Sequence, residues 1–272
     1  MQSQTKFSFT RKLTESAVML ALTVVLSFFK LVDLPYGGSI TLFSMLPVIL
    51  IAYRHGLTWG LMTGFANGVL QLLMGLKSLS YATSAGAVVA IILLDYLLAF
   101  TVTGFGGVFR KRCQKQTTAL VAGTVLACAL RYLFHVISGC TVWAGLSIPD
   151  SQALLNSLVY NATYMLPELL ITVVGAAFLS NAVGFDGDHL TRLQTEKQDK
   201  SALVWRIIGA AGAAAAAIAD VVLVGSKLQN AESGDFDITG IANVNFLAVG
   251  IITVCGIVLF VVCRLIAKHK KA

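Results

Sequence analysis

Residues 110–138 read RKRCQKQTTALVAGTVLACALRYLFHVIS, and this stretch decides the fold class. A cluster of basic residues comes first, and residues 118–138 then contain one formal charge, Arg131. About 20 such residues cross roughly 30 Å of hydrocarbon as an α-helix. A strand of a membrane β-barrel would instead show about ten residues of alternating polarity. The stretch therefore predicts a transmembrane helix that begins beside a basic loop.

The rest of the chain repeats this pattern. Of 272 residues, 57% are apolar and 12% are charged, with a mean hydropathy of +0.80. Soluble domains carry about 25% charged residues, so a water-soluble fold does not explain the sequence. The predicted fold class is an all-α integral membrane protein. We predict eight transmembrane helices, at residues 13–31, 40–53, 57–75, 82–106, 118–138, 153–182, 203–224 and 241–264.

Charge then sets the orientation. With both termini on the cytoplasmic side, sixteen of the 20 Lys and Arg residues fall in cytoplasmic segments, as the positive-inside rule requires. The net charge of +7 therefore indicates cytoplasmic loops and no nucleic-acid partner. The basic leader before the first apolar stretch lacks a following Ala-x-Ala-like cleavage site, so we expect that stretch to remain as the first span. The expected location is a cell membrane.

A polar, charged stretch divides the chain. Residues 184–202 are predicted to form a cytoplasmic linker between a six-helix domain, residues 1–183, and a two-helix extension, residues 203–272. In the extension only Asp220 suggests a site.

Two sets of small residues are predicted to serve packing. Gly56, Gly60, Gly64 and Gly68 recur every four residues and lie on one face of the third helix, where another helix can approach closely. The five cysteines form no Cys-x-x-Cys pair, so neither a metal site nor a disulfide is expected. They are Cys113, Cys128, Cys140, Cys255 and Cys263.

Three charged residues stand out within the predicted spans, because an unpaired charge near the bilayer centre costs several kcal/mol. Asp95 and Glu168 lie midway along the fourth and sixth helices, and Arg131 lies on the fifth. Arg131 either neutralises one of the two acids and locks helices together, or leaves a carboxylate available to a cationic ligand. Both interpretations remain open at this point.

Polar and aromatic residues gather in the outer half of the predicted bundle. On the fifth helix Arg131, His135 and Gly139 recur every four residues and share a face, and Trp143 follows in the loop. The other members of this set are Tyr160, Asn161 and Tyr164 on the sixth helix, and Tyr36 and Tyr81 at outer helix ends. Aromatic faces beside a carboxylate are suited to a flat organic cation. No ATP-binding loop, esterase elbow or zinc-protease motif accompanies them, so we expect no enzyme and no catalytic residues.

These residues resemble a known family, the thiamine-specific S components (ThiT family) of energy-coupling factor transporters. His135, Gly139 and Trp143 are similar to that family's His-x-x-x-Gly-x-x-x-Trp signature, and Asn161 lies where its binding asparagine falls. Asp95 and Tyr96 match an acidic-aromatic pair on the fourth helix, where glutamate is the more familiar acid. The resemblance covers about residues 8–182 and leaves the two C-terminal helices outside it.

The resemblance implies a thiamine-binding subunit that has no chemistry and no cofactor of its own. Asp95 would pair with the charge of the ligand, while His135 and Asn161 would hydrogen-bond it. Tyr96 and Trp143 would stack on it, and Gly139 would make room. Ala17 and Ala21 on the first helix resemble the docking face for a membrane-embedded coupling subunit, which two ABC-type ATPase subunits drive.

Three other functions remain. A proton-coupled secondary transporter would carry its proton on Asp95 or Glu168. A binding subunit for another vitamin would keep the mechanism and change the pocket. An enzyme acting on a membrane lipid would need a nucleophile and base or a metal cluster, and the sequence offers neither.

Overall fold

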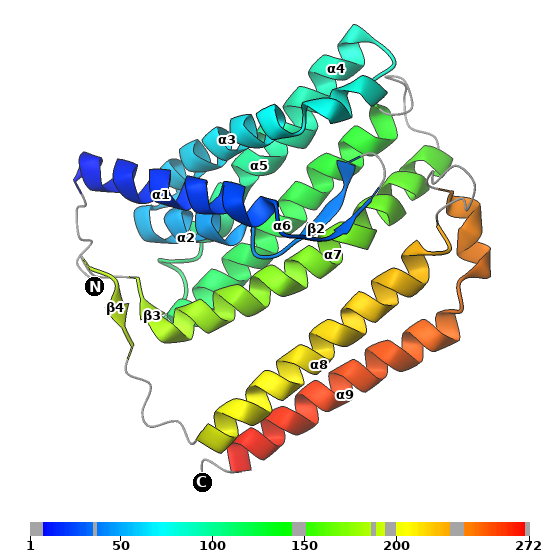
Figure 1. Cartoon of the computed structure of the whole chain (residues 1–272). Coiled ribbons are helices and arrows are strands. Elements are labelled where there is room, and N and C mark those ends of the chain that lie inside the picture. Colours follow the sequence, from blue (N-terminus) through cyan, green and yellow to red (C-terminus); the bar gives the residue numbers. More distant parts are fainter. Residues whose placement is uncertain are drawn as a thin grey trace. The chain divides into compact units, whose positions relative to one another are not determined.

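A computed structural model describes residues 8–34, 37–142, 151–185, 189–193, 200–228 and 237–269 (Figure 1). The chain forms two compact units that divide between residues 193 and 194, inside the predicted linker. Each unit is described by itself.

The first unit is almost entirely helical (Figure 1). Its elements are α1 (Phe9–Ser27), β1 (Lys30–Asp33), β2 (Ser39–Thr41), α2 (Leu46–His55), α3 (Leu57–Met74), η2 (Leu76–Tyr81), α4 (Ala85–Ile91), η3 (Ile92–Leu98), α5 (Ala99–Thr101), η4 (Val102–Gly107), α6 (Gln116–Thr141), α7 (Ser151–Ala182), β3 (Val183–Gly184) and β4 (Thr191–Arg192). The segment from α4 to η4 is one continuous helical run of 23 residues. Its middle part, η3, is π-helical.

The second helix was predicted at residues 40–53, and its predicted start at residue 40 is wrong. Ser39–Thr41 is a strand that pairs antiparallel with β1, and β1 also replaces the last residues of the predicted first helix. Phe43 has a φ of 61°, which a right-handed helix does not allow. Helix α2 therefore begins at Leu46, with Pro47 in its first turn, where a missing N–H is tolerated.

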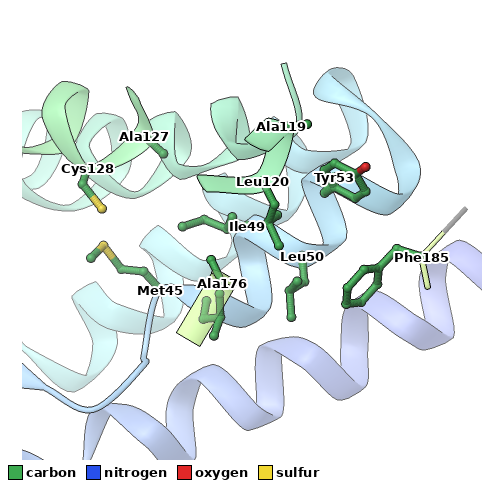
Figure 2. Close-up of a cluster of buried hydrophobic side chains, with 11 residues drawn as sticks. Met45, Ile49, Leu50, Tyr53, Ala119, Leu120, Ala127, Cys128, Ala176 and Phe185 are labelled. Atoms are coloured by element: carbon green, nitrogen blue, oxygen red, sulfur yellow. The ribbon is translucent and has the colours of Figure 1, made fainter. Parts of the chain in front are cut away.

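Helix α2 forms the centre of the first unit. Every residue from Leu46 to Arg54 is buried. Figure 2 shows the main cluster, in which Met45, Ile49, Leu50 and Tyr53 pack with Ala119, Leu120, Ala127 and Cys128 of α6, Ala176 of α7 and Phe185. The site described below is built on the helices that surround this cluster.

The predicted packing role of the glycines on α3 is confirmed for three of the four. A Cβ at Gly60, Gly64 or Gly68 would lie 3.0, 2.7 and 2.8 Å, respectively, from a backbone carbonyl oxygen of the Ala85–Gly107 segment. Gly56 has no atom within 4 Å of such a Cβ, but its φ of +93° forms the sharp turn between α2 and α3.

Five helices in the described ranges are long and apolar enough to cross a membrane. They are Ala85–Gly107, Gln116–Thr141, Ser151–Ala182, Ser201–Gly225 and Phe246–Ala267. Eight spans were predicted. Helices α1 and α3 have 19 and 18 residues, whereas α2 has 10, or about 15 Å, and cannot cross 30 Å of hydrocarbon alone.

The second unit is a helical hairpin of α8 (Lys200–Gly225) and α9 (Phe246–His269), with η5 (Ile238–Asn243) before α9. The two helices pack through small residues, since a Cβ at Gly256 would lie 2.6 Å from the Cβ of Ala216. Thr253 on α9 donates a hydrogen bond to Asp220 on α8 at 2.6 Å. Asp220 therefore links the two helices of the hairpin.

Candidate functional site

The carboxylate of Asp95 lies against helix α6. His135 Nδ1 is 2.8 Å from Asp95 Oδ1, and Ser138 Oγ donates a hydrogen bond to Oδ2 at 2.5 Å. His135 and Ser138 share a face of α6 because they are three residues apart. Asp95 itself lies in the π-helical segment η3, a distortion that is frequent at functional sites. Two of the predicted ligand-binding residues are thus in direct contact.

The other ring nitrogen of His135, Nε2, faces away from Asp95. Among the residues that the structure describes, Nε2 is a buried nitrogen without a hydrogen-bond partner. The side chain is 11% exposed. A buried polar atom without a partner costs about 1–3 kcal/mol, so a ligand group that satisfies it gains this amount. When Nδ1–H donates to Asp95, Nε2 is an acceptor.

Asn161 and Tyr164 of α7 hold the helix that carries His135. Asn161 Nδ2 donates to the backbone oxygen of Ser157 at 2.8 Å and to that of His135 at 3.3 Å. Tyr164 donates to Asn161 Oδ1 at 2.5 Å, and its ring meets the His135 ring edge to face at 6.1 Å. Asn161 therefore positions the backbone of His135. Its predicted direct contact with a ligand stays a prediction.

The space at Gly139 is filled by α7. A Cβ there would lie 2.2 Å from Ser157 Oγ, which itself donates to the backbone oxygen of Val136 at 2.8 Å. The glycine was expected to make room for a ligand, whereas in the structure it allows close packing of α6 and α7.

Sequence reasoning missed Ser138 and Ser157. Only their helical spacing from His135 and Asn161 could have indicated them.

Tyr160 connects the site to the segment before β2. Its hydroxyl accepts a hydrogen bond from the backbone N–H of Gly38 at 3.2 Å, and its ring packs edge to face with Tyr164 at 5.8 Å. A Cβ at Gly38 would lie 2.8 Å from the Tyr160 hydroxyl and 2.9 Å from the Tyr164 ring. Residue 38 therefore has to be glycine for the chain to run this close to both rings.

Arg131 pairs with Glu168, not with Asp95. Arg131 Nη1 donates to Glu168 Oε2 at 3.1 Å, and the guanidinium lies 4.4 Å from the centre of the Phe100 ring. Thr41 and Ser44 donate to the other carboxylate oxygen of Glu168. This network joins α6, α7, the end of β2 and the segment between β2 and α2. It leaves the charge of Asp95 without an arginine partner among the described residues.

The remaining predicted residues have no described side-chain contact with Asp95 or His135, or lie outside the described ranges. Tyr96 donates to the backbone oxygen of Gly75 at 3.0 Å, at the end of α3. Tyr81 is 44% exposed at the end of η2. Ala17 and Ala21 are exposed on α1. Tyr36 and Trp143 lie outside the described residues. Within the described ranges, no group of three His, Cys, Asp or Glu side chains could hold a metal ion.

Known proteins resemble the first unit. A thiamine transporter ThiT of Bacillus subtilis (strain 168) is 30% identical over 174 residues, which is 60% of this chain and 86% of that protein. A thiamine transporter ThiT of Lacticaseibacillus paracasei is 24% identical and covers 59% of this chain and 82% of its own length.

Structural comparison points to the same proteins. A solved structure of ThiT from Listeria monocytogenes matches with a TM-score of 0.50 and 26% identity, over 63% of this chain and 93% of that one. It confirms the all-α membrane fold. The family model described as thiamine transporter protein (Thia_YuaJ) matches residues 13–184. Because this match spans more than half of the chain, the chain belongs to the thiamine transporter protein family, Thia_YuaJ.

Proposed function

We propose that this protein is the substrate-binding membrane subunit of a thiamine uptake system. Family membership supports the substrate class. The observation that carries the assignment of the site is the Asp95–His135 pair, in which a carboxylate has no arginine partner and a buried imidazole nitrogen has no partner among the described residues. Thiamine has two flat aromatic rings, one of them cationic and the other with neutral ring nitrogens, so it matches both groups.

Each group of the site has a separate role. A carboxylate offers about four acceptor positions, and His135 and Ser138 occupy two, so Asp95 can still pair with a cation. His135 Nε2 hydrogen-bonds the ligand ring. Tyr96 and Trp143 stack on the ligand, and Tyr36, Tyr81, Tyr160 and Tyr164 complete the aromatic wall. Asn161 reaches the ligand or orients His135, and Gly139 keeps the two helices close.

Transport requires other subunits. The chain has no nucleotide-binding loop, so the energy is expected to come from two ABC-type ATPases acting through a membrane-embedded coupling subunit. Ala17 and Ala21 are exposed on α1, where a second helix can approach closely. The protein lies in a bacterial plasma membrane with both termini in the cytoplasm. Thiamine is the cargo, and no resident cofactor is involved.

Ligand titration of the purified full-length chain tests this function. We expect thiamine to raise the melting temperature, because a ligand that binds only the folded state stabilises it. Thiamine should also quench tryptophan fluorescence, and the quench should disappear in Trp143→Phe, which retains Trp59 and Trp205. Riboflavin serves as the comparison ligand. The absence of any thiamine-dependent shift would contradict the proposal.

The same preparation distinguishes the proposed binding subunit from the main alternative, a proton-coupled transporter. A proton-coupled transporter takes up thiamine into liposomes under a pH gradient without ATP or partners. A binding subunit does not. Uptake by the chain alone would therefore favour the secondary transporter.

A further inference from the structure

Helix α1 is attached to the first unit by polar contacts. Its buried residues are Ser16, Thr23 and Ser27. Ser16 Oγ bonds to another helix, whereas Ser27 Oγ donates within α1 and Thr23 Oγ1 has no partner among the described residues. Five of its large apolar side chains are exposed; for example, Val18 is 62% exposed and Val25 is 52% exposed. Lipid is as apolar as these side chains, so no hydrophobic force holds membrane helices together. The orientation of α1 therefore depends on its few polar contacts.

Glu15 makes the largest group of these contacts. Its Oε2 accepts a hydrogen bond from Arg54 Nε at 2.7 Å and lies 2.7 Å from His55 Nε2. Its Oε1 accepts from Arg11 Nε at 2.9 Å. Arg54 is 4% exposed, and its Nη1 donates to the backbone oxygen of Phe185 at 3.0 Å. One carboxylate thus joins α1 to the last turn of α2 and, through Arg54, to the segment after α7.

The next residue on α1 faces the same way. Trp59 Nε1 donates to Ser16 Oγ at 2.7 Å, and Lys12 Nζ lies 5.6 Å from the centre of the Trp59 ring. Successive residues of an α-helix are turned by about 100°, so inward positions 15 and 16 place Ala17 and Ala21 on the outer face. Both alanines are exposed. Without the contacts of Glu15, this end of α1 would keep its contacts with Trp59, which come from Ser16, Lys12 and the Phe9 ring.

We propose that Glu15 is a positioning residue, which sets the rotation of α1 and so presents Ala17 and Ala21 to a membrane-embedded partner subunit. The inference rests on the proposed function, because it assumes that such a partner drives transport. Glu15 does not touch the Asp95–His135 site in any contact described for it. Its loss should therefore separate assembly from ligand binding.

The test uses Glu15→Gln in the full chain. Thiamine affinity of the isolated subunit is measured first, and recovery of the complex with the coupling subunit and its ATPases is measured after co-expression. We expect the thiamine Kd to stay within about twofold and complex recovery to fall by about tenfold or more. Thr14→Ala is the matched control on the same helix, because Thr14 Oγ1 donates only to the backbone oxygen of Thr10.

Each other outcome has a defined meaning. Normal assembly of Glu15→Gln overturns the inference. If Glu15→Gln no longer binds thiamine, the double variant Glu15→Gln with Arg54→Gln, which removes the buried Arg54 guanidinium together with the carboxylate, decides. Impaired assembly with intact binding in that variant supports the inference, and normal assembly or lost binding overturns it.

If the unmodified chain does not bind thiamine, the proposed function fails. If it binds thiamine but assembles with no coupling subunit, the proposed thiamine-binding function stands, whereas the proposed partners and the inference fail.

Discussion

At the scale of single residues, Asp95 tests the ligand site most directly. Asp95→Asn keeps the shape of the side chain but removes its charge and turns an amide group toward either His135 or Ser138. We expect thiamine binding to weaken by about 1–3 kcal/mol, or roughly 5- to 150-fold in Kd, measured by titration calorimetry. Asp95→Glu retains the charge and should lose less affinity. An unchanged Kd in Asp95→Asn would remove this residue from the site.

The Arg131–Glu168 pair makes a second prediction at this scale. Arg131→Met or Glu168→Met alone leaves a buried unpaired charge, which costs about 3–5 kcal/mol of unfolding free energy. The double substitution removes both charges and should cost less than the sum of the two single losses. Thermal or denaturant unfolding in detergent measures all four proteins. Additive losses would show that the two side chains do not depend on each other.

The chemistry of the site was partly predictable from individual residues. Asp95 could be found because a charged group inside a membrane is energetically costly. His135 could be found because it lies one helical turn from Arg131 and from Gly139. Ser138 could not, because a hydroxyl group is inexpensive there and common. The partner of Arg131 could not be chosen either, since two acids lay at suitable depths and the sequence does not give the rotation of each helix.

At the scale of helices, the contact between α3 and the Ala85–Gly107 segment depends on glycine. A Cβ at Gly64 would meet the backbone oxygens of Phe100 and Thr101 at 2.7 and 2.8 Å, and neither backbone group can move alone. We expect Gly64→Ala to lower the unfolding free energy by about 1–3 kcal/mol through overpacking. Thermal unfolding measures it. Gly250→Ala on α9 is the control, because nothing lies within 4 Å there, and it should not destabilise.

Long helices were easier to predict than short elements. The spans at residues 118–138 and 153–182 are found as α6 and α7, because continuous apolar runs of this length have few alternatives. The β1–β2 hairpin was missed because strands of four and three residues carry too little alternation to outweigh neighbouring apolar positions. The π-helical segment η3 was missed because the apolar run around it gives no sign of an altered helical repeat.

At the scale of the whole molecule, the outer apolar surface explains the composition. Leu, Ile, Val and Phe side chains are exposed along the long helices of both units, while Glu168, Arg131 and Asn67 are buried. This is the reverse of a soluble protein, in which charged residues are rarely buried and lie mostly at the surface. The high apolar content of the sequence therefore predicts that the helices face lipid, but it does not predict which helices are in contact. Which helices meet depends on a few polar pairs and glycines.

The last prediction concerns the C-terminal hairpin, which lies beyond the family match at residues 13–184. Removal of residues 194–272 should leave thiamine affinity within about twofold, since the candidate site lies entirely within the first unit. A cut after Ala182 is the informative comparison. It removes Phe185, whose ring packs against Tyr53 at 6.2 Å and whose carbonyl accepts from Arg54. Thermal shift and calorimetry on both truncations should show binding in the longer chain and a lower melting temperature in the shorter one. Loss of thiamine binding in the longer chain, with an unchanged melting temperature, would instead assign the hairpin a part in ligand capture.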